Sequence, residues 1–338
     1  MYQTLHCHTK LSDGELSHKQ VLKLCLEKNI NVVAFTDHDA LPDKRIIKDL
    51  RNFSGKKVNW IIGCELTSGF PEEIGGIGGL FHITGLFVNP FDKALKESCR
   101  KTQQSRIERM KLMVKNLKTL GFAVSAENCL KESKGESVSR PHIIAALRKK
   151  EKNLKIIRGL ARKMALVAKT DPKVKERYLQ MLKSGERKYP FWLFLDKKAF
   201  FPGIYADYPY YRDMDEAVKL IRGAGGVAVL AHWVFTEDPV NLKIIGKLFK
   251  EKRLDGAEII FGIPASRGRL DQMRESMEKI ERLTKKYNVI QAGGPDLHRK
   301  KEFDYFIKTK WFAEKTIGLV ERIMKERKLN LEWSSFTP

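Results

Sequence analysis

Short apolar runs alternate with amphipathic stretches along the first ninety residues of the chain. Four of these runs are rich in β-branched and aromatic residues, which is typical of strands, and they lie at 2–6, 31–36, 59–65 and 80–88. Between the first two, Ser17 begins a Ser-x-x-Gln capping pattern that predicts a helix to about Lys28. The hydrophobic pattern therefore predicts strand–helix units in this part of the chain.

The same alternation returns after residue 213. The predicted helices here are 213–223, 239–250 and 266–287, and the predicted strands are 226–232, 256–260 and 289–293. Repeated strand–helix units favour parallel strands in a barrel or an open sheet. The intervening chain instead has long, basic, helix-forming runs with few β-branched clusters. We therefore expect one α/β domain in two parts, 1–90 and 213–338, the second with a C-terminal tail, around an inserted helical subdomain at 91–212.

The net charge of the chain is +23, and most of the excess lies in the expected insertion. Between Asp92 and Pro190 there are 27 Lys and Arg against 10 Asp and Glu, a net charge of +17. A localised basic field attracts polyanions such as a nucleic acid. A solvated basic surface without a binding role is the alternative, and the sequence leaves both open.

The apolar runs, the start of the chain and the cysteines together indicate a protein of a reducing compartment. No apolar run has the length of a membrane span, and the start of the chain lacks the features of a signal peptide, so we expect a cytoplasmic protein with no membrane partner. The five cysteines are scattered without a Cys-x-x-Cys pair, which argues against a disulfide framework. Cys7 and Cys64 neighbour candidate ligands but are expected to point away from them, because side chains alternate along a strand.

Most of the eight histidines lie beside acidic residues at predicted strand ends. In a parallel α/β barrel the carboxyl ends of the strands converge on one mouth, where these side chains would meet. Mixed imidazole and carboxylate ligands suit Zn²⁺, Mn²⁺ or Fe²⁺ better than Ca²⁺ or Mg²⁺ alone, and burying so many polar groups without a metal would be costly. We expect two or three divalent ions. The candidate ligands are His6, His8, Asp13, His38, Glu65, His82, His232, Asp296 and His298.

Seven motifs along the chain, in this order, resemble the PHP (polymerase and histidinol phosphatase) superfamily. They are His-x-His, Ser-Asp-Gly, Thr-Asp-His-Asp, Gly-x-Glu, Arg-Pro-His, Leu-Ala-His and Asp-x-His. The resemblance covers about 1–90 and 213–300, with Ser-Arg-Pro-His at 139–142. It is strongest to stand-alone phosphoesterases that act on nucleoside 3′,5′-bisphosphates and on RNA 5′ ends, which carry a helical insertion at this place. It implies a distorted (β/α)7 TIM-like barrel and up to three metals.

The resemblance also implies a division of labour among these residues. One metal would be held by His6, His8, Glu65 and Asp296, a second by Glu65, His82 and His232, and a third by Asp13, His38 and His298. Arg140 and His142 would bind the substrate phosphate, a role that suits the guanidinium fork of arginine. The alternative for Arg140 is an ordinary helix start with proline in the first turn. Asp37 or His232 could protonate the leaving oxygen, and Asp37 could equally be a hydrogen-bond partner of a ligand histidine.

Three departures from the family pattern leave the substrate open. Trp233 replaces the usual proline after Leu-Ala-His, and the family's Ser-Asp-Phe-His motif appears as Gly294-Pro295-Asp296-Leu297-His298. The stretch 191–211 is rich in aromatic residues. Two other features of the sequence are not expected to take part in catalysis or ligand binding. His18 is expected in the first turn of a helix facing solvent, and the glycine-rich run 75–79 lacks the Gly-Lys-Ser/Thr of a P-loop.

These observations predict direct hydrolysis of a phosphate ester by metal-activated water, without a Ser or Cys nucleophile. The expected substrate is a phosphorylated nucleotide or a short RNA or DNA end. One alternative is a small-molecule phosphatase, such as a histidinol-phosphatase. A second is a nucleic-acid-binding protein with a structural metal site, although structural sites do not need several metals.

Overall fold

The structure is a computed structural model, which describes residues 1–53, 58–69, 80–133, 137–235, 241–262 and 270–336. The chain divides into two compact units. The first, the sheet unit, comprises the described residues of 1–102 and of 211–338. The second, the helical unit, comprises the described residues of 103–210.

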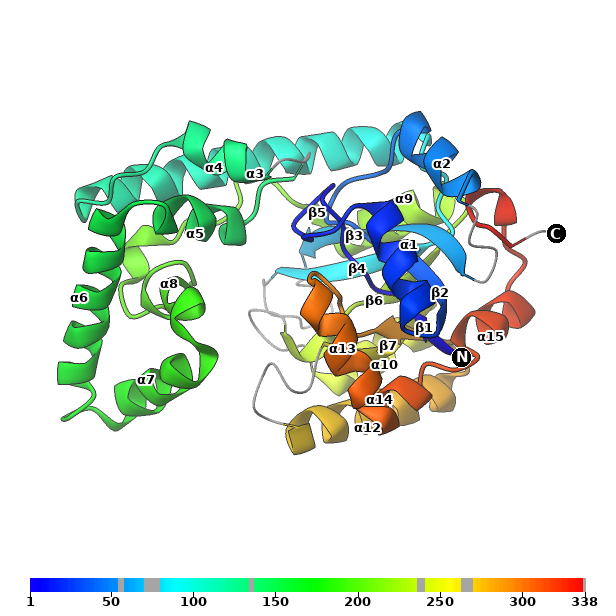
Figure 1. Ribbon diagram of the computed structural model, residues 1–338. Helices are drawn as coiled ribbons and strands as arrows, with labels where there is room; N and C mark the ends of the chain where they lie inside the picture. The colour runs from blue at the N-terminus through cyan, green and yellow to red at the C-terminus, as the bar shows by residue number, and fades with distance from the viewer. Residues whose placement is uncertain (54–57, 70–79, 134–136, 236–240, 263–269, 337–338) are drawn as a thin grey trace. The chain divides into compact units, whose positions relative to one another are not determined.

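The sheet unit is built on one mixed sheet with the strand order β1-β2-β3-β4-β6-β7-β8, and β5 pairs with β3 (Figure 1). Its strands are β1 (Tyr2–Thr4), β2 (Ile30–Phe35), β3 (Asn59–Gly69), β4 (Leu80–Leu86), β5 (Arg212–Asp213), β6 (Val227–Leu230), β7 (Gly256–Phe261) and β8 (Ile290–Gly294). Strands β2, β6 and β7 consist almost entirely of buried residues, as expected for a sheet covered on both faces.

Strand β4 runs antiparallel to both of its neighbours, β3 and β6, whereas the other pairs in the sheet are parallel. The prediction of parallel strands throughout is therefore wrong for β4. Only ten residues separate Gly69 from Leu80, and a crossover to a parallel strand needs a dozen or more. A return in the opposite direction is the arrangement that this length permits.

The helices of the sheet unit lie around the sheet (Figure 1). They are α1 (His18–Glu27), α2 (Lys44–Arg51), α9 (Met214–Gly223), α10 (Leu242–Lys250), α12 (Leu270–Tyr287), α13 (Lys300–Lys308), α14 (Lys310–Glu314) and α15 (Leu319–Glu326), with short 3₁₀ turns at Trp233–Phe235 and Leu331–Trp333. The predicted capping box is present, because Ser17 accepts from the Gln20 backbone and the Gln20 side chain accepts from the Ser17 backbone. Beyond residue 298 the chain forms α13, α14 and α15.

The segments that follow β1 and β8 lie side by side. The Leu5 amide donates to the Gly293 carbonyl at 3.1 Å, and the His8 amide donates to the Leu297 carbonyl at 2.8 Å. Gly294 occupies the contact itself, since a Cβ there would come within 2.7 Å of Thr4 Oγ1 and 2.8 Å of the His6 backbone nitrogen. A side chain at position 294 would therefore clash with the segment that follows β1.

The helical unit has its own hydrophobic core, formed by helices and by the aromatic stretch that follows them. Its helices are α3 (Lys93–Thr119), which begins in the sheet unit, then α4 (Ala126–Ser133), α5 (Arg140–Arg148), α6 (Glu151–Val167), α7 (Pro172–Ser184) and α8 (Tyr189–Leu193), with 3₁₀ turns at Glu186–Lys188 and Pro202–Ile204. Phe194 is fully buried in this core and packs on Phe122 at 5.2 Å between ring centroids. Part of the aromatic stretch is thus used for packing.

Candidate metal centre

All nine candidate ligands belong to the sheet unit, and most lie at or just beyond strand ends. The antiparallel direction of β4 explains the position of His82 near the start of its strand. His82 pairs in register with Thr67, two residues beyond Glu65 on β3. The amino end of β4 therefore lies beside the carboxyl end of β3, and His82 meets the ligands from the parallel strands.

The Glu65 carboxylate lies at the centre of the group and is fully buried. Its Oε2 atom is within 3.2 Å of ring nitrogens of His6, His8 and His38. Its Oε1 atom is 2.7 Å from Nδ1 of His82 and 2.7 Å from Nε2 of His232. One carboxylate thus contacts five imidazoles, which is an arrangement that can bridge two cations.

A second cluster of side chains, around Asp13, Asp296 and His298, adjoins the cluster around Glu65. Asp13 Oδ1 is 3.3 Å from His298 Nε2 and 3.8 Å from His8 Nδ1. Asp296 Oδ1 is 3.2 Å from His8 Nε2 and 3.5 Å from His6 Nε2. The His8 ring stacks on the His298 ring with 4.2 Å between the ring centroids, so His8 belongs to both clusters.

Ligand atoms of these residues lie within 4.8 Å of one another in four overlapping groups. The groups are His8, Asp13, His38 and His298; His6, His8 and Asp296; His6, Glu65 and His232; and His38, Glu65 and His82. They contain all nine predicted ligands. His38 belongs to two of them, whereas the family resemblance implied that it serves one metal.

Several of these atoms are buried without a hydrogen-bond partner among the described residues. They are Asp13 Oδ1, His38 Nδ1, His82 Nδ1 and Asp296 Oδ1. Each buried atom left in this state costs about 1–3 kcal/mol. Each nevertheless lies 2.7–3.3 Å from a ligand atom of another residue, at an angle unsuited to a hydrogen bond. Atoms that point toward a shared position and lack a partner fit divalent metal ions with mixed nitrogen and oxygen ligands.

The electrostatics of the group favour charged carboxylates. Burial alone would raise the pKa of Glu65, Asp13 and Asp296, but the surrounding histidines hold each pKa well below its usual range. Burial works against a proton on His298, yet the carboxylates of Asp296 and Asp13 raise its pKa to about 10. Burial lowers the pKa of His38 to about 3, which leaves that imidazole neutral and ready to bind a metal.

Glu258 on β7 is a buried acid of this centre that the sequence analysis missed. Its Oε1 atom accepts from His6 Nδ1 at 2.6 Å and from Thr84 Oγ1 at 3.1 Å, and its Oε2 atom accepts from the His232 amide at 2.9 Å. A proton on His6 Nδ1 leaves Nε2 free to face Glu65. The available signal was a single charged residue within the apolar run Gly256–Phe261, all of which is buried.

Asp37 is not one of the converging ligands. It accepts from the Thr9 amide at 2.8 Å, from Thr9 Oγ1 at 2.8 Å and from Ser12 Oγ at 2.6 Å. These bonds hold the turn that links His8 to Asp13.

His18 is buried beside Asp37, so the prediction that it faces solvent is wrong. Only 7% of the residue is exposed, and its ring lies 4.6 Å from that of Phe35 on β2. Its Nε2 atom is 3.8 Å from Asp37 Oδ2. The first turn of α1 packs against the strand, a tertiary contact that the local sequence does not reveal.

Arg140 and His142 both belong to the helical unit, at the start of α5. His142 Nδ1 accepts from the Ser139 amide at 2.9 Å and so caps the helix. The Arg140 guanidinium donates to the Leu195 carbonyl and to Asp196, each at 3.3 Å. Their predicted contact with a substrate phosphate stays a prediction.

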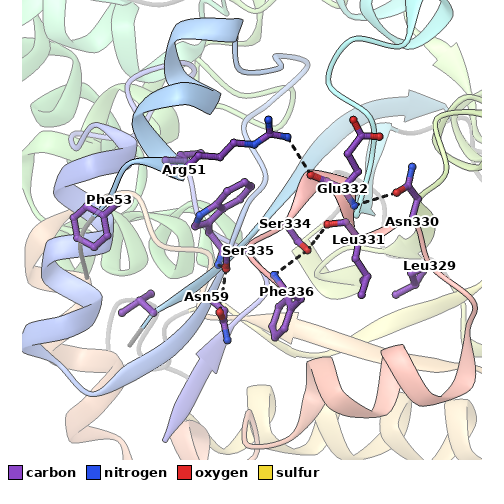
Figure 2. Close-up of a pocket in the computed structure, with 13 residues that line it drawn as sticks. Arg51, Phe53, Asn59, Leu329, Asn330, Leu331, Glu332, Ser334, Ser335 and Phe336 are labelled. Carbon is purple, nitrogen blue, oxygen red and sulfur yellow. Dashed lines mark hydrogen bonds between the residues drawn. The ribbon is translucent and has the colours of Figure 1, made fainter. Parts of the chain in front are cut away.

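A cavity of about 960 Å³ lies elsewhere in the sheet unit, between the C-terminal tail and the amino end of β3 (Figure 2). Its wall includes Trp60, whose carbonyl accepts from the Ser335 amide at 2.9 Å. Along β3 this end is about 20 Å from Glu65, at roughly 3.3 Å per residue. None of the four ligand groups borders it, so the cavity is separate from the metal centre.

The remaining predictions have mixed outcomes. Cys7 and Cys64 lie in the hydrophobic core of the sheet unit, as the alternation along their strands predicts, and Trp233 joins the same core. The glycine-rich run 75–79 lies outside the described residues. Within the described part of the chain, no helix combines the length and the apolar character needed to cross a membrane.

Comparison with known proteins identifies similar enzymes. The chain is 25% identical over 228 residues to the 5′-3′ exoribonuclease Rnm of Salmonella typhimurium, a match that covers 68% of this chain and 64% of that protein. It is 25% identical to a phosphoribosyl 1,2-cyclic phosphate 1,2-diphosphodiesterase of Eggerthella lenta, over 89% of this chain and 95% of the relative. It is 22% identical to the 3′,5′-nucleoside bisphosphate phosphatase of Chromobacterium violaceum, over 87% and 86%.

A solved structure and a family model also match this chain. A Bifidobacterium adolescentis structure, proposed to be a metal-dependent phosphoesterase, matches with a TM-score of 0.63 and 20% identity, over 88% of each chain. It shares the α/β architecture. The model of the PHP domain family matches residues 4–292, which confirms the resemblance inferred from the seven motifs. With ligands for metal ions gathered on Glu65 and most of the chain matched, the protein belongs to the PHP domain family and is a metal-dependent phosphoesterase.

Proposed function

We propose that this protein hydrolyses a phosphate ester of a nucleotide or of an oligonucleotide end, with two or three divalent metals bound by the nine residues gathered on Glu65. One observation carries the proposal: five imidazoles surround a single buried carboxylate, and a second group with two further carboxylates adjoins it. A structural site would need one metal and would be closed by four ligands. Nine ligands suit a site that binds several ions and a phosphate.

Divalent metals bound there supply positive charge for the phosphate oxygens and lower the pKa of a bound water. Residues of the chain that bind no metal would hold the ligands in position for this chemistry. Glu258 fixes the tautomer of His6, and Asp37 holds the turn between His8 and Asp13. We therefore assign Asp37 a positioning role and not that of the general acid. His232, beside Glu65, remains the candidate of the two for a proton to the leaving oxygen.

We propose further that the sheet closes into a distorted (β/α)7 barrel. The hydrogen bonds between the segments after β1 and β8 support this arrangement, because they join the first and last strands of the order. Closure would bring the carboxyl ends of the parallel strands to one mouth.

The helical unit would supply recognition of a polyanion. Between Gln103 and Tyr210 there are 25 Lys and Arg against 10 Asp and Glu, a net charge of +15. Arg140, at the start of α5, would take part in this recognition, because the guanidinium fork matches phosphate oxygens. The similar proteins named as an exoribonuclease and a nucleoside bisphosphate phosphatase point to the same class of substrate.

The test compares three substrates with the metal-loaded enzyme: a nucleoside 3′,5′-bisphosphate, a short 5′-phosphorylated RNA and histidinol phosphate. We expect phosphate or nucleotide release from one or both of the first two, and loss of this release after treatment with a chelator. Cleavage of histidinol phosphate alone would overturn the nucleotide assignment. Activity that is unaffected by complete metal removal would overturn the proposed role of the nine residues.

A further inference from the structure

We propose that Arg212 is a positioning residue for the metal centre, and that it acts through Asp39 on the two segments that carry His38 and Glu65. The inference rests on the proposed function, because it assumes that these ligands bind metal. Arg212 lies in none of the seven motifs, and its effect would be on metal affinity.

Arg212 is fully buried, and its guanidinium is surrounded by hydrogen-bond acceptors. Nη1 donates to Asp39 Oδ1 at 2.7 Å and to the Thr67 carbonyl at 3.1 Å. Nε and Nη2 donate to Oγ and the carbonyl of Ser98, at 2.8 and 2.7 Å, and Nη2 also donates to Thr102 Oγ1 at 2.6 Å. Taking an arginine charge out of water is costly unless it is paired and hydrogen-bonded, and every nitrogen of this one is used.

Asp39 connects this buried arginine to the metal ligands. Its carboxylate also accepts from the amide and the hydroxyl of Thr67, at 3.1 and 2.7 Å, and its own amide donates to the Glu65 carbonyl at 3.0 Å. Asp39 has a φ of +46°, a left-handed conformation that a side chain such as aspartate tolerates when its surroundings hold it. The Arg212–Asp39 pair thus fixes an unfavourable backbone conformation directly after His38.

The same loop is joined to β3 on the other side of His38. The Glu65 amide donates to the Asp37 carbonyl at 3.1 Å, so residues 37 and 39 both bond to the backbone of Glu65. Between them, His38 Nδ1 lies 3.1 Å from Glu65 Oε2. A shift of Asp39 would therefore move His38 relative to Glu65 and change the two ligand groups that contain His38.

The hydrogen bonds of Arg212 also mark where the chain passes between the two units. The chain leaves the sheet unit after Thr102 and returns at Tyr211. Thr102 accepts from Arg212, and Arg212 directly follows the point of return. The guanidinium therefore links both chain connections to the loop that carries His38.

The test uses Arg212→Met, which removes the charge, and Arg212→Lys, which keeps the charge but loses the fork. Metal content is measured by elemental analysis of folded protein, and metal affinity by competition with a chromophoric chelator. We expect Arg212→Met to lose one metal equivalent or to bind its weakest metal at least about tenfold less tightly, with a lower kcat and an unchanged KM. Arg212→Lys should recover part of the affinity.

Arg222→Met is the control, because Arg222 is a partly exposed arginine that forms an ion pair with Asp255 at the amino ends of β6 and β7. Its Nη2 lies 3.0 Å from Asp255 Oδ1, and Asp255 also accepts from the Ala228 amide at 2.8 Å. This variant should lose thermal stability and keep the full metal content. If Arg222→Met loses as much metal as Arg212→Met, the effect is one of general stability and the proposal is wrong.

Two further outcomes are decisive. If Arg212→Met does not fold, Asp39→Asn and Arg212→Lys take its place, and native metal affinity in both would overturn the proposal. If Arg212→Met folds and binds every metal with native affinity, the arginine is merely structural. A native protein that binds no metal would overturn the proposed function itself, and this inference with it.

Discussion

Replacement of Glu258 by glutamine tests whether an acid that binds no metal controls the metal centre. In the native protein the carboxylate accepts from three donors, on His6, Thr84 and the His232 backbone. A glutamine of the same shape has one acceptor oxygen and an amide group that only donates. If the oxygen keeps the bond to the His232 amide, the amide group faces the donors of His6 and Thr84. His6 then loses the partner that fixes its tautomer.

The expected loss of metal affinity in Glu258→Gln follows from the hydrogen bond between Glu258 and His6 that is lost. A hydrogen bond to a charged group contributes about 1.5–3 kcal/mol. Since about 1.4 kcal/mol is a factor of ten in an equilibrium constant, metal affinity should fall by about 10–100-fold, the range typical of partners of ligand histidines. The metal-free protein should lose about 1–3 kcal/mol in its free energy of unfolding, because buried donors are left unsatisfied.

Chelator competition measures the metal affinity of Glu258→Gln, and denaturant unfolding of the metal-free protein measures its stability. Glu251→Gln is a suitable control, because Glu251 is exposed and lies 3.9 Å from Lys247, a surface pair of little energetic weight. We expect native affinity in the control. Native affinity in Glu258→Gln, in a protein that has lost stability, would refute the idea that the carboxylate orients His6 for metal binding.

Three further predictions concern the metals and the substrate. Asp13→Ala and His298→Ala should each nearly abolish turnover while circular dichroism shows a native fold, because the ligands around Glu65 remain; near-native rates would mean that this group binds no essential metal. The raised pKa of His298, about 10, means that a metal must displace its proton below that pH. Apparent metal affinity should therefore rise about tenfold per pH unit between pH 7 and 9, with about one proton released per site in calorimetry in two buffers; a flat profile would contradict the protonated state. Affinity for a short 5′-phosphorylated RNA should fall more steeply with salt than affinity for a nucleoside bisphosphate, and equal slopes would mean that the basic helical unit contacts no RNA.

Most of the candidate ligands could be proposed from the sequence because each carries a local signal. Short motifs such as His-x-His and Thr-Asp-His-Asp directly follow apolar strands, and strand ends converge in an α/β fold. In the structure all nine residues lie within the four ligand groups. The direction of β4 was not within reach of the sequence, because the predicted strands 59–65 and 80–88 leave 14 residues between them, enough for a parallel crossover. Only the observed extension of β3 to Gly69 shortens this connection to ten residues.

The residues that were missed carry their signal in tertiary contacts. Glu258 bonds to His6, which lies 252 residues away in the chain, and the sequence around a single acid in a strand does not indicate its partner. His18 is polar and begins a helix, yet its burial depends on the packing of that helix against Phe35. Arg212 resembles any surface arginine in the sequence, and only the fold brings Asp39 to it.

The Thr-Asp-His-Asp motif shows how one short segment can serve both metal binding and its support. Only the histidine of the motif faces the ligand groups. Asp37 turns the other way and holds the segment from Thr9 to Ser12, whereas Asp39 bonds to Thr67 and Arg212. Each of these buried acids accepts at least three hydrogen bonds, so neither has to bind a metal to be satisfied. Ligands from separate strands need supports of this kind, because carboxylates held close together repel one another and neighbouring imidazoles compete for protons until metal is bound.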